Sequence, residues 1–196
     1  MRKTTSTLFL AIAALCVLSP LTAQDAAAKA PKAATKAAPG GRASPHETVS
    51  TRVGGGRTQT MVTITYGRPY AKGRPIWGEL VKWDKADRLG ADEATTLTTQ
   101  IPISLGGTTL QPGAYTLYII ASATGVSKLA ISSHVGKWGV PVDETKDIAR
   151  VDLKKDTLTD AVEQLTLSFA PPADGATALK ISWANTVYSV AIAQVK

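Results

Sequence analysis

Apolar and polar residues alternate along most of the chain beyond residue 45. Between Thr58 and Tyr66 every second residue is β-branched or aromatic, which is the period of two expected of a half-buried strand. Alternation of this kind, or a short apolar run between turn residues, recurs at 49–53, 94–99, 101–105, 108–110, 115–122, 126–132, 148–153, 165–169, 179–183 and 187–192. No helical periodicity of any length interrupts these runs.

Turn residues separate the predicted strands. Gly106-Gly107 lies between two alternating runs and indicates a tight hairpin, because both central residues of such a turn need a positive φ. Pro112-Gly113, Thr124-Gly125 and Pro171-Pro172 end other runs. About ten short strands at this spacing predict an all-β fold, an antiparallel β-sandwich of jelly-roll-like or Ig-like type rather than a closed barrel.

The first 44 residues have a different composition. A basic start and an apolar run at 8–18, ended by Pro20, are typical of a signal peptide over residues 1–23, so we expect export to the periplasm or the extracellular space. Residues 24–44 are rich in Ala, Lys and Pro and predict a disordered linker. The β-domain is then expected at 45–196, without a membrane-spanning segment in the mature chain.

Charge narrows the classes of partner. The formal net charge is +7, but from Pro45 onward there are sixteen basic and fourteen acidic residues. A nearly neutral domain lacks the basic footprint of a nucleic-acid-binding protein. We therefore expect no nucleic-acid partner.

Charged and aromatic residues are densest between Tyr66 and Thr96. Glycines and prolines at 67–75 forbid a regular strand there, and the apolar segment 76–81 is expected to anchor the loop to the core. The candidate ligand-binding residues are Arg68, Tyr70, Lys72, Arg74, Trp83, Arg88, Asp92, Glu93 and, further along, Trp138.

These residue types allow two interpretations. Guanidinium groups bind carboxylates and phosphates through paired hydrogen bonds, and loop aromatics stack on sugar rings, so the loop is a candidate site for a small anionic or carbohydrate-like ligand. Alternatively, the arginines hold the loop in shape by bonding backbone carbonyls and nearby acids. Trp77, Tyr115 and Trp183 are expected in the core instead.

Signals of catalysis and metal binding are weak. Asp92 and Glu93 could serve hydrolysis, with Arg88 as an electrostatic helper, but neighbouring residues on a strand point to opposite faces. His46 and His134 are far apart and show no metal-ligand spacing. We therefore assign no catalytic residue, metal or cofactor, and favour a non-enzymatic protein.

The loop also carries a resemblance. Gly67-Arg68-Pro69, Lys72-Gly73-Arg74, the segment 77–81 and the segment 88–96 are similar to the domain-of-unknown-function 2911 family of exported bacterial proteins. The segment 110–118 and Trp138-Gly139 extend the similarity. Two residues depart from the family pattern: Asp87 stands where the family usually has Trp, and Asp92 where it usually has Asn. The resemblance covers roughly Ser44 to Val195, nearly the whole mature domain, so it supports one domain there, and it implies no established activity.

Three functional hypotheses follow. The first is an exported, non-enzymatic module that binds a small anionic or carbohydrate-like ligand, or a partner protein, through the loop at 67–96. The second is a hydrolase that uses Asp92 or Glu93 with Arg88. The third is a purely structural envelope protein in which the loop only closes one end of the sandwich.

Overall fold

Alternation along the sequence gives strands throughout the described part of the chain. The computed structural model describes residues 43–195, which contain eleven β-strands, two short 3₁₀ turns and no α-helix. The expected signal peptide at 1–23 and nearly all of the expected linker at 24–44 lie outside the described residues. Within 43–195, no helix has the length and hydropathy needed to cross a bilayer.

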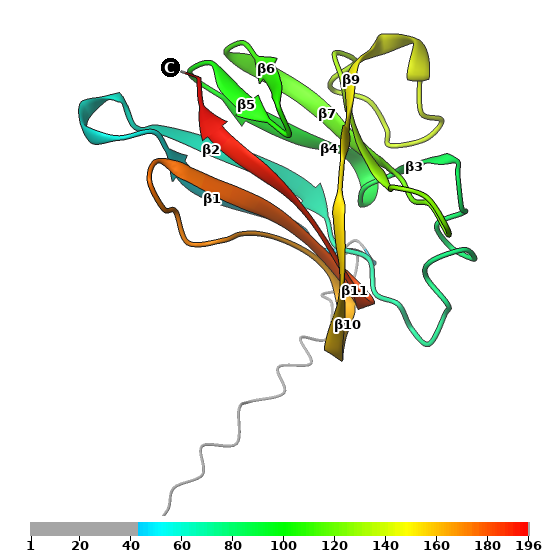
Figure 1. Cartoon of the computed structure of the whole chain (residues 1–196). Helices are drawn as coiled ribbons and strands as arrows, with labels where there is room; N and C mark the ends of the chain where they lie inside the picture. Colours follow the sequence, from blue (N-terminus) through cyan, green and yellow to red (C-terminus); the bar gives the residue numbers. More distant parts are fainter. Residues whose placement is uncertain (1–42, 196) are drawn as a thin grey trace, which may run out of the picture. The chain divides into compact units, whose positions relative to one another are not determined.

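The larger of the two sheets has seven strands, all antiparallel (Figure 1). Six follow the order β1-β2-β4-β7-β8-β9, and β3 pairs with the far end of β7 beside β4. Their bounds are β1 His46–Val53, β2 Thr60–Gly67, β3 Ala86–Arg88, β4 Ala91–Thr99, β7 Gly113–Ile120, β8 Lys128–Ser132 and β9 Asp147–Asp152.

The smaller sheet has four strands in the antiparallel order β10-β11-β5-β6. Their bounds are β5 Ile103–Leu105, β6 Thr108–Leu110, β10 Lys154–Phe169 and β11 Ala176–Gln194. Two register shifts interrupt the pairing of β10 with β11, one on each side of Val162. The 3₁₀ turns are Gly56–Thr58 and Glu144–Lys146.

One apolar cluster lies between the two sheets. The larger sheet contributes Ile64, Leu97, Leu117 and Ile131, and the smaller one contributes Ile103, Leu167, Ile181, Tyr188 and Ile192, all at most 1% exposed. Strands β2 and β11 bury alternate residues, as in a sandwich with one core between two sheets. The predicted all-β antiparallel sandwich is confirmed.

Three strands differ from the sequence prediction. Strand β3 was not expected, because its three residues show no alternation. The run at 165–169 is the end of the longer β10, whose first half is mostly exposed and polar. The two runs at 179–183 and 187–192 form the single strand β11, which continues through Ala184 although its φ is 49°. The hairpin at Gly106-Gly107 has positive φ at both residues, as predicted.

A close backbone approach joins β2 to the start of β4. A Cβ on Gly67 would lie 2.2 Å from the carbonyl oxygen of Ala91, so a side chain there is excluded. Gly90 has φ 141°, and Asp92 follows with φ 64°, in the left-handed region that Asp tolerates better than most residues. The pairing register of β2 with β4 shifts at this point, between Thr65 and Gly67.

The segment between β2 and β3 forms the long loop beside the lowest part of β10 and β11 in Figure 1, which is the middle of each strand. Its first part bonds to β10, with Ala71 N donating to Glu163 O at 2.7 Å and Leu165 N donating to Pro69 O at 2.9 Å. Its middle is anchored by Ile76, 3% exposed, and Val81, 5% exposed. The expected apolar anchor is therefore present.

Trp77 adds a polar and an aromatic contact to this anchor. Its indole Nε1 donates to the carbonyl oxygen of Trp183 at 3.2 Å, and its ring meets Tyr188 edge to face at 5.0 Å. Both partners belong to β11, so the loop is fixed to the smaller sheet and its side chains are held in defined positions.

Candidate functional site

The loop, the β2–β4 irregularity and the middle of β11 line a hollow of about 600 Å³. This volume lies within the range of small-molecule sites, which is about 300–1,000 Å³. Its lining includes five ionisable side chains and two aromatic ones: Lys72, Arg74, Asp87, Arg88, Asp92, Tyr70 and Trp183. Leu80, Val81 and Val140 supply apolar surface. Five of the nine residues predicted from the sequence are thereby brought together.

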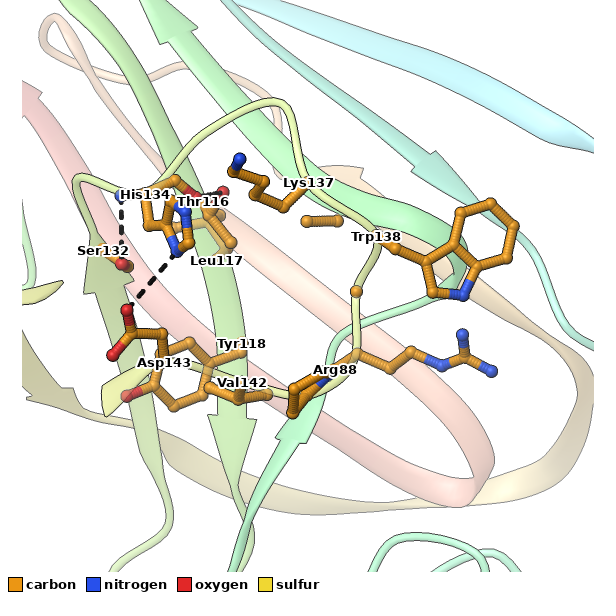
Figure 2. Close-up of a pocket in the computed structure, with 13 residues that line it drawn as sticks. Arg88, Thr116, Leu117, Tyr118, Ser132, His134, Lys137, Trp138, Val142 and Asp143 are labelled. Carbon is orange, nitrogen blue, oxygen red and sulfur yellow. Dashed lines mark hydrogen bonds and ion pairs between the residues drawn. The ribbon is translucent and has the colours of Figure 1, made fainter. Parts of the chain in front are cut away.

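Arg88 occupies the shared wall of this hollow and a smaller one. It lies on β3 opposite Tyr118 of β7, so regular pairing fixes its backbone. Among the described residues, no hydrogen bond or ion pair of its guanidinium is found, although its charge acts on neighbouring Asp87. In Figure 2 the Arg88 side chain points away from His134 and Asp143, in the same direction as Trp138. Its donors are available to a ligand.

Arg74 is held by its own loop. Its Nε donates to the carbonyl oxygen of Ala71 at 2.9 Å, and one terminal nitrogen donates to that of Tyr70 at 2.7 Å. A guanidinium has five donors, so this arrangement fixes the plane of the group and leaves other N–H groups free to bond a ligand. Lys72 is positioned through its backbone, which has φ 51° and donates to the Glu163 carboxylate at 2.8 Å.

Trp183 contributes a buried donor. The residue is 5% exposed, and its indole Nε1 finds no hydrogen-bond partner within the described part of the chain. A buried donor without a partner costs about 1–3 kcal/mol. Trp183 was expected in the core, and it does pack there, but it also lines the hollow.

Asp87 and Asp92 bring negative charge to the same hollow. Burial raises the pKa of Asp87, while the backbone N–H and the guanidinium of Arg88 act in the opposite direction. The Asp87 carboxylate accepts the Arg88 backbone N–H at 2.8 Å. Three cations and two carboxylates therefore line the hollow, so its ionised side chains carry a small positive excess.

Arg68 does not line the hollow. Its guanidinium bonds the Leu165 carbonyl oxygen at 3.2 Å and Thr166 Oγ1 at 2.8 Å, and pairs with the Glu47 carboxylate at 3.1 Å. Glu47 also accepts the Tyr66 hydroxyl at 2.9 Å. Burial first, aided by the hydrogen bond to Glu47, raises the pKa of Tyr66 to about 12. Arg68 thus ties β1 and β2 to β10, as in the loop-holding interpretation.

The three predicted aromatics separate. Tyr70 lines the hollow and is 37% exposed. Trp83 packs against the core, with Lys155 Nζ 5.6 Å from its ring centre, and is not among the residues that line the hollow. Trp138 is 54% exposed and lines the smaller hollow beside Arg88.

Asp92 and Glu93 meet His46 at the edge of the hollow. The His46 Nε2 atom lies 3.1 Å from Glu93 Oε2 and 3.7 Å from Asp92 Oδ2. Strand alternation had predicted opposite faces for the two carboxylates, but the left-handed backbone of Asp92 breaks that alternation. Gly67 and Gly90, both close to this point, are the sequence signal that could have indicated the irregularity.

The smaller hollow lies between β7, β8 and the segment that follows β8. His134 Nδ1 lies 3.6 Å from Asp143 Oδ2, and the His134 backbone N–H donates to Ser132 Oγ, as the dashed lines in Figure 2 mark. A hydrogen bond from Thr145 lowers the pKa of Asp143. With a volume of about 30 Å³, this hollow has room for little more than a water molecule.

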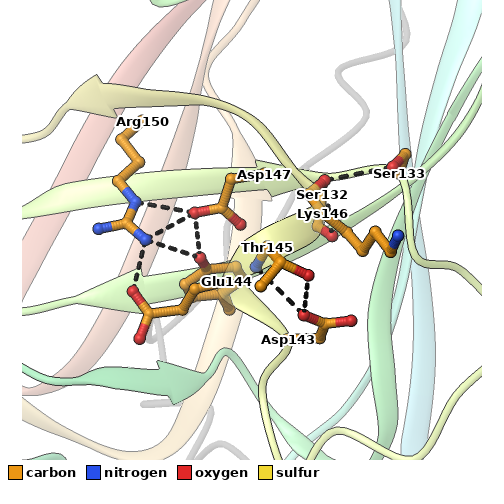
Figure 3. A network of polar contacts seen from close by, with 9 residues as sticks. Ser132, Ser133, Asp143, Glu144, Thr145, Lys146, Asp147 and Arg150 are labelled. Carbon is orange, nitrogen blue, oxygen red and sulfur yellow. Dashed lines mark hydrogen bonds and ion pairs between the residues drawn. The ribbon is translucent and has the colours of Figure 1, made fainter.

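A polar network next to it fixes the start of β9 (Figure 3). Arg150 Nε donates to Asp147 Oδ2 at 2.8 Å, and a terminal nitrogen of Arg150 donates to Glu144. The Tyr118 hydroxyl donates to the same Asp147 oxygen, and burial followed by this bond raises the pKa of Tyr118. These bonds hold the 3₁₀ turn against β7 and β9, although the other Asp147 oxygen, Oδ1, is buried without a hydrogen-bond partner in the described chain.

One of three comparisons with known proteins found a match, and it covers the β-domain. Among the curated proteins and among the solved structures, no match to the chain was found. A protein-family model described as "Protein of unknown function (DUF2911)" matches residues 44–192, which cover the whole two-sheet domain except its last few residues. The chain therefore belongs to the DUF2911 family.

Proposed function

We propose that the protein is an exported, non-enzymatic module that binds a small anionic ligand in the hollow between the 68–85 loop, β3 and β11. The observation that carries this proposal is the convergence of Lys72, Arg74 and Arg88 on one hollow of about 600 Å³. Export is supported by the apolar run at 8–18 after a basic start.

Two properties favour an anion with several oxygen atoms, such as a carboxylate, a phosphate or an acidic sugar. Arg74 is fixed by two backbone carbonyls, so it can form charge-assisted bonds with little loss of freedom. Arg88 has a guanidinium without a hydrogen-bond partner in the described chain, so all its donors are available to an anion. The Trp183 indole N–H is a further donor in need of an acceptor. Tyr70 and Leu80 provide apolar surface for the rest of the ligand.

A thermal-shift panel tests the proposal. The purified protein is heated with inorganic phosphate, sugar phosphates, mono- and dicarboxylates, uronic acids and their neutral counterparts. We expect stabilisation by one class of anion and none by the matched neutral compounds. Arg88→Gln should weaken the affinity for that anion about 10- to 100-fold, the loss of one charge-assisted contact.

Arg52→Gln is the matched control, because Arg52 is an exposed arginine of β1 that does not line the hollow. Equal affinity in wild type and Arg52→Gln with a loss in Arg88→Gln supports the hollow as the site. No shift with any anion, or an equal loss in both variants, would overturn the proposal.

Hydrolysis is the second candidate function, because one observation favours it. Asp87 and Asp92 line the same hollow as Arg88, and burial raises the pKa of Asp87, as a general acid requires. Chromogenic glycosides, esters and phosphates test it. The hydrolase is favoured if wild type turns over one of these substrates and Asp87→Asn loses this turnover but still binds the anion. If wild type turns over none of them, the hydrolase is rejected and the binding module is retained.

A further inference from the structure

We propose that His46, Asp92 and Glu93 form a binding site for one divalent transition-metal ion, of which Zn²⁺ is the representative. The site lies on β1 and the irregular start of β4. It does not depend on the anion proposed above, because none of its three side chains is needed to hold the arginines of the hollow.

The donor set fits such an ion. One imidazole nitrogen and two carboxylate oxygens are ligands that Zn²⁺ takes in proteins, and three protein ligands with one open position are typical of an accessible zinc site. The two carboxylates are negatively charged oxygen ligands, which attract a divalent cation. The mixed nitrogen and oxygen donors favour a transition metal over Ca²⁺ or Mg²⁺, which prefer oxygen ligands alone.

Their separations fit as well. Two donor atoms bound to the same Zn²⁺ at about 2.0–2.2 Å in a tetrahedron lie about 3.3–3.6 Å apart. His46 Nε2 lies 3.1 Å from Glu93 Oε2 and 3.7 Å from Asp92 Oδ2. All three donor atoms lie within 4.8 Å of one another, so a shift of about 1 Å at one carboxylate completes the set.

The backbone holds these donors in place. His46 pairs with Gly67, and Gly67 pairs with Ala91, so the register of three strands brings position 92 next to position 46. The Asp92 carbonyl oxygen accepts the Gly139 N–H at 2.9 Å, and Glu93 bridges to Trp138. The positive φ of Asp92 then turns its carboxylate to the same side as that of Glu93.

The site is open to an entering ion. The side chains of His46, Asp92 and Glu93 are 29%, 27% and 45% exposed. Asp92 also lines the hollow, so a metal here would place positive charge at the rim of the proposed anion site.

The test uses untagged protein treated with a chelator, because a histidine tag would add ligands. Zn²⁺ and Mn²⁺ binding is measured by calorimetry, with Ca²⁺ and Mg²⁺ as the oxygen-preferring ions, and without any candidate anion. We expect one Zn²⁺ per chain. Loss of a residue that only supports a ligand costs about 10- to 100-fold in metal affinity, so His46→Ala and Glu93→Gln should each cost at least about 100-fold.

His134→Ala is the control, because the second histidine has one carboxylate, that of Asp143, near its imidazole. Its loss should leave Zn²⁺ affinity unchanged. The imidazole ¹⁵N spectrum gives an independent readout: with two histidines in the chain, Zn²⁺ should shift Nε2 of His46 and leave His134 in place.

Two results would overturn the proposal. One is the absence of Zn²⁺ binding at millimolar concentration, which would make the cluster a histidine–carboxylate ion pair. The other is binding that His134→Ala abolishes and His46→Ala does not. Because metal binding is measured without an anion, its failure and the failure of the anion site remain distinguishable.

Discussion

Replacing Gly67 by alanine tests the close backbone approach that shapes both candidate sites. The new Cβ would lie 2.2 Å from the Ala91 carbonyl oxygen, 2.9 Å from its carbon and 3.2 Å from its nitrogen. These are backbone atoms that cannot turn aside, so β2 and the start of β4 must separate by about 1 Å, which counts as overpacking.

The magnitude follows from two opposing terms. Overpacking costs typically about 1–3 kcal/mol, and the upper end applies where backbone must move. Alanine also reduces the entropy of the unfolded chain, which stabilises the folded state by about 0.4–1 kcal/mol. The net loss in the free energy of unfolding is then about 2 kcal/mol, and a chain of this length should lose about 4–8 °C in Tm.

Gly55→Ala is the matched control, because no heavy atom lies within 4 Å of a Cβ at that position and its φ of −128° suits any residue. Thermal and urea unfolding of both variants give the comparison. We expect Gly55→Ala to stay within about 0.5 kcal/mol of wild type. Equal stability of the two variants would refute the reasoning, as would a Gly67→Ala protein that binds Zn²⁺ and anions with unchanged affinity.

Three further predictions concern contacts outside the hollow. Arg68→Met should cost about 1–3 kcal/mol in urea unfolding, through its lost bonds to Glu47 and β10, and leave anion affinity intact; weaker anion binding without a stability change would contradict its structural role. Trp77→Ala should cost about 3 kcal/mol, because its hydrogen bond and its contact with Tyr188 are lost, and should expose the loop to limited proteolysis; a loop still resistant to protease would argue against this anchor. Tyr66 has a pKa of about 12 in the folded protein against 10.0 in the unfolded one, so its stabilising contribution is complete below pH 10 and is lost as the pH rises to 12, about 2–3 kcal/mol in all. The free energy of unfolding, measured across pH 9–12, should therefore fall in wild type and fall less in Tyr66→Phe. Equal falls in the two proteins would be evidence against this contribution.

Strands and core could be predicted because alternation is a local property of the sequence. Val62, Ile64 and Tyr66 occupy every second position and are all buried, and the two glycines at 106–107 form the expected turn. Strand β10 could not be bounded, since its exposed polar half carries no alternation and is held by pairing with β11.

The candidate site was predictable only in part, because its members depend on contacts between distant segments. Arg68 and Arg74 belong to the same loop and are chemically identical in the sequence. The Arg68 guanidinium is paired with Glu47 and hydrogen-bonded to Thr166, whereas Arg74 lines the hollow. Pairing across three strands places Asp92 beside His46, and the spacing of these residues along the chain does not predict such a contact.

The Trp183 indole offers the most direct test of the anion site, because Trp183 lines the hollow and its N–H is buried without a partner in the described chain. In a ¹H–¹⁵N spectrum its signal is assigned with Trp183→Phe. Titration with the anion that stabilises the protein most should shift the Trp183 signal downfield. It should also make the Arg88 guanidinium signal narrower than in the free protein. The Trp77 indole signal should not move, because that N–H is already bonded to the Trp183 carbonyl oxygen. An anion that binds tightly yet leaves the Trp183 signal unmoved would contradict the placement of the ligand in this hollow.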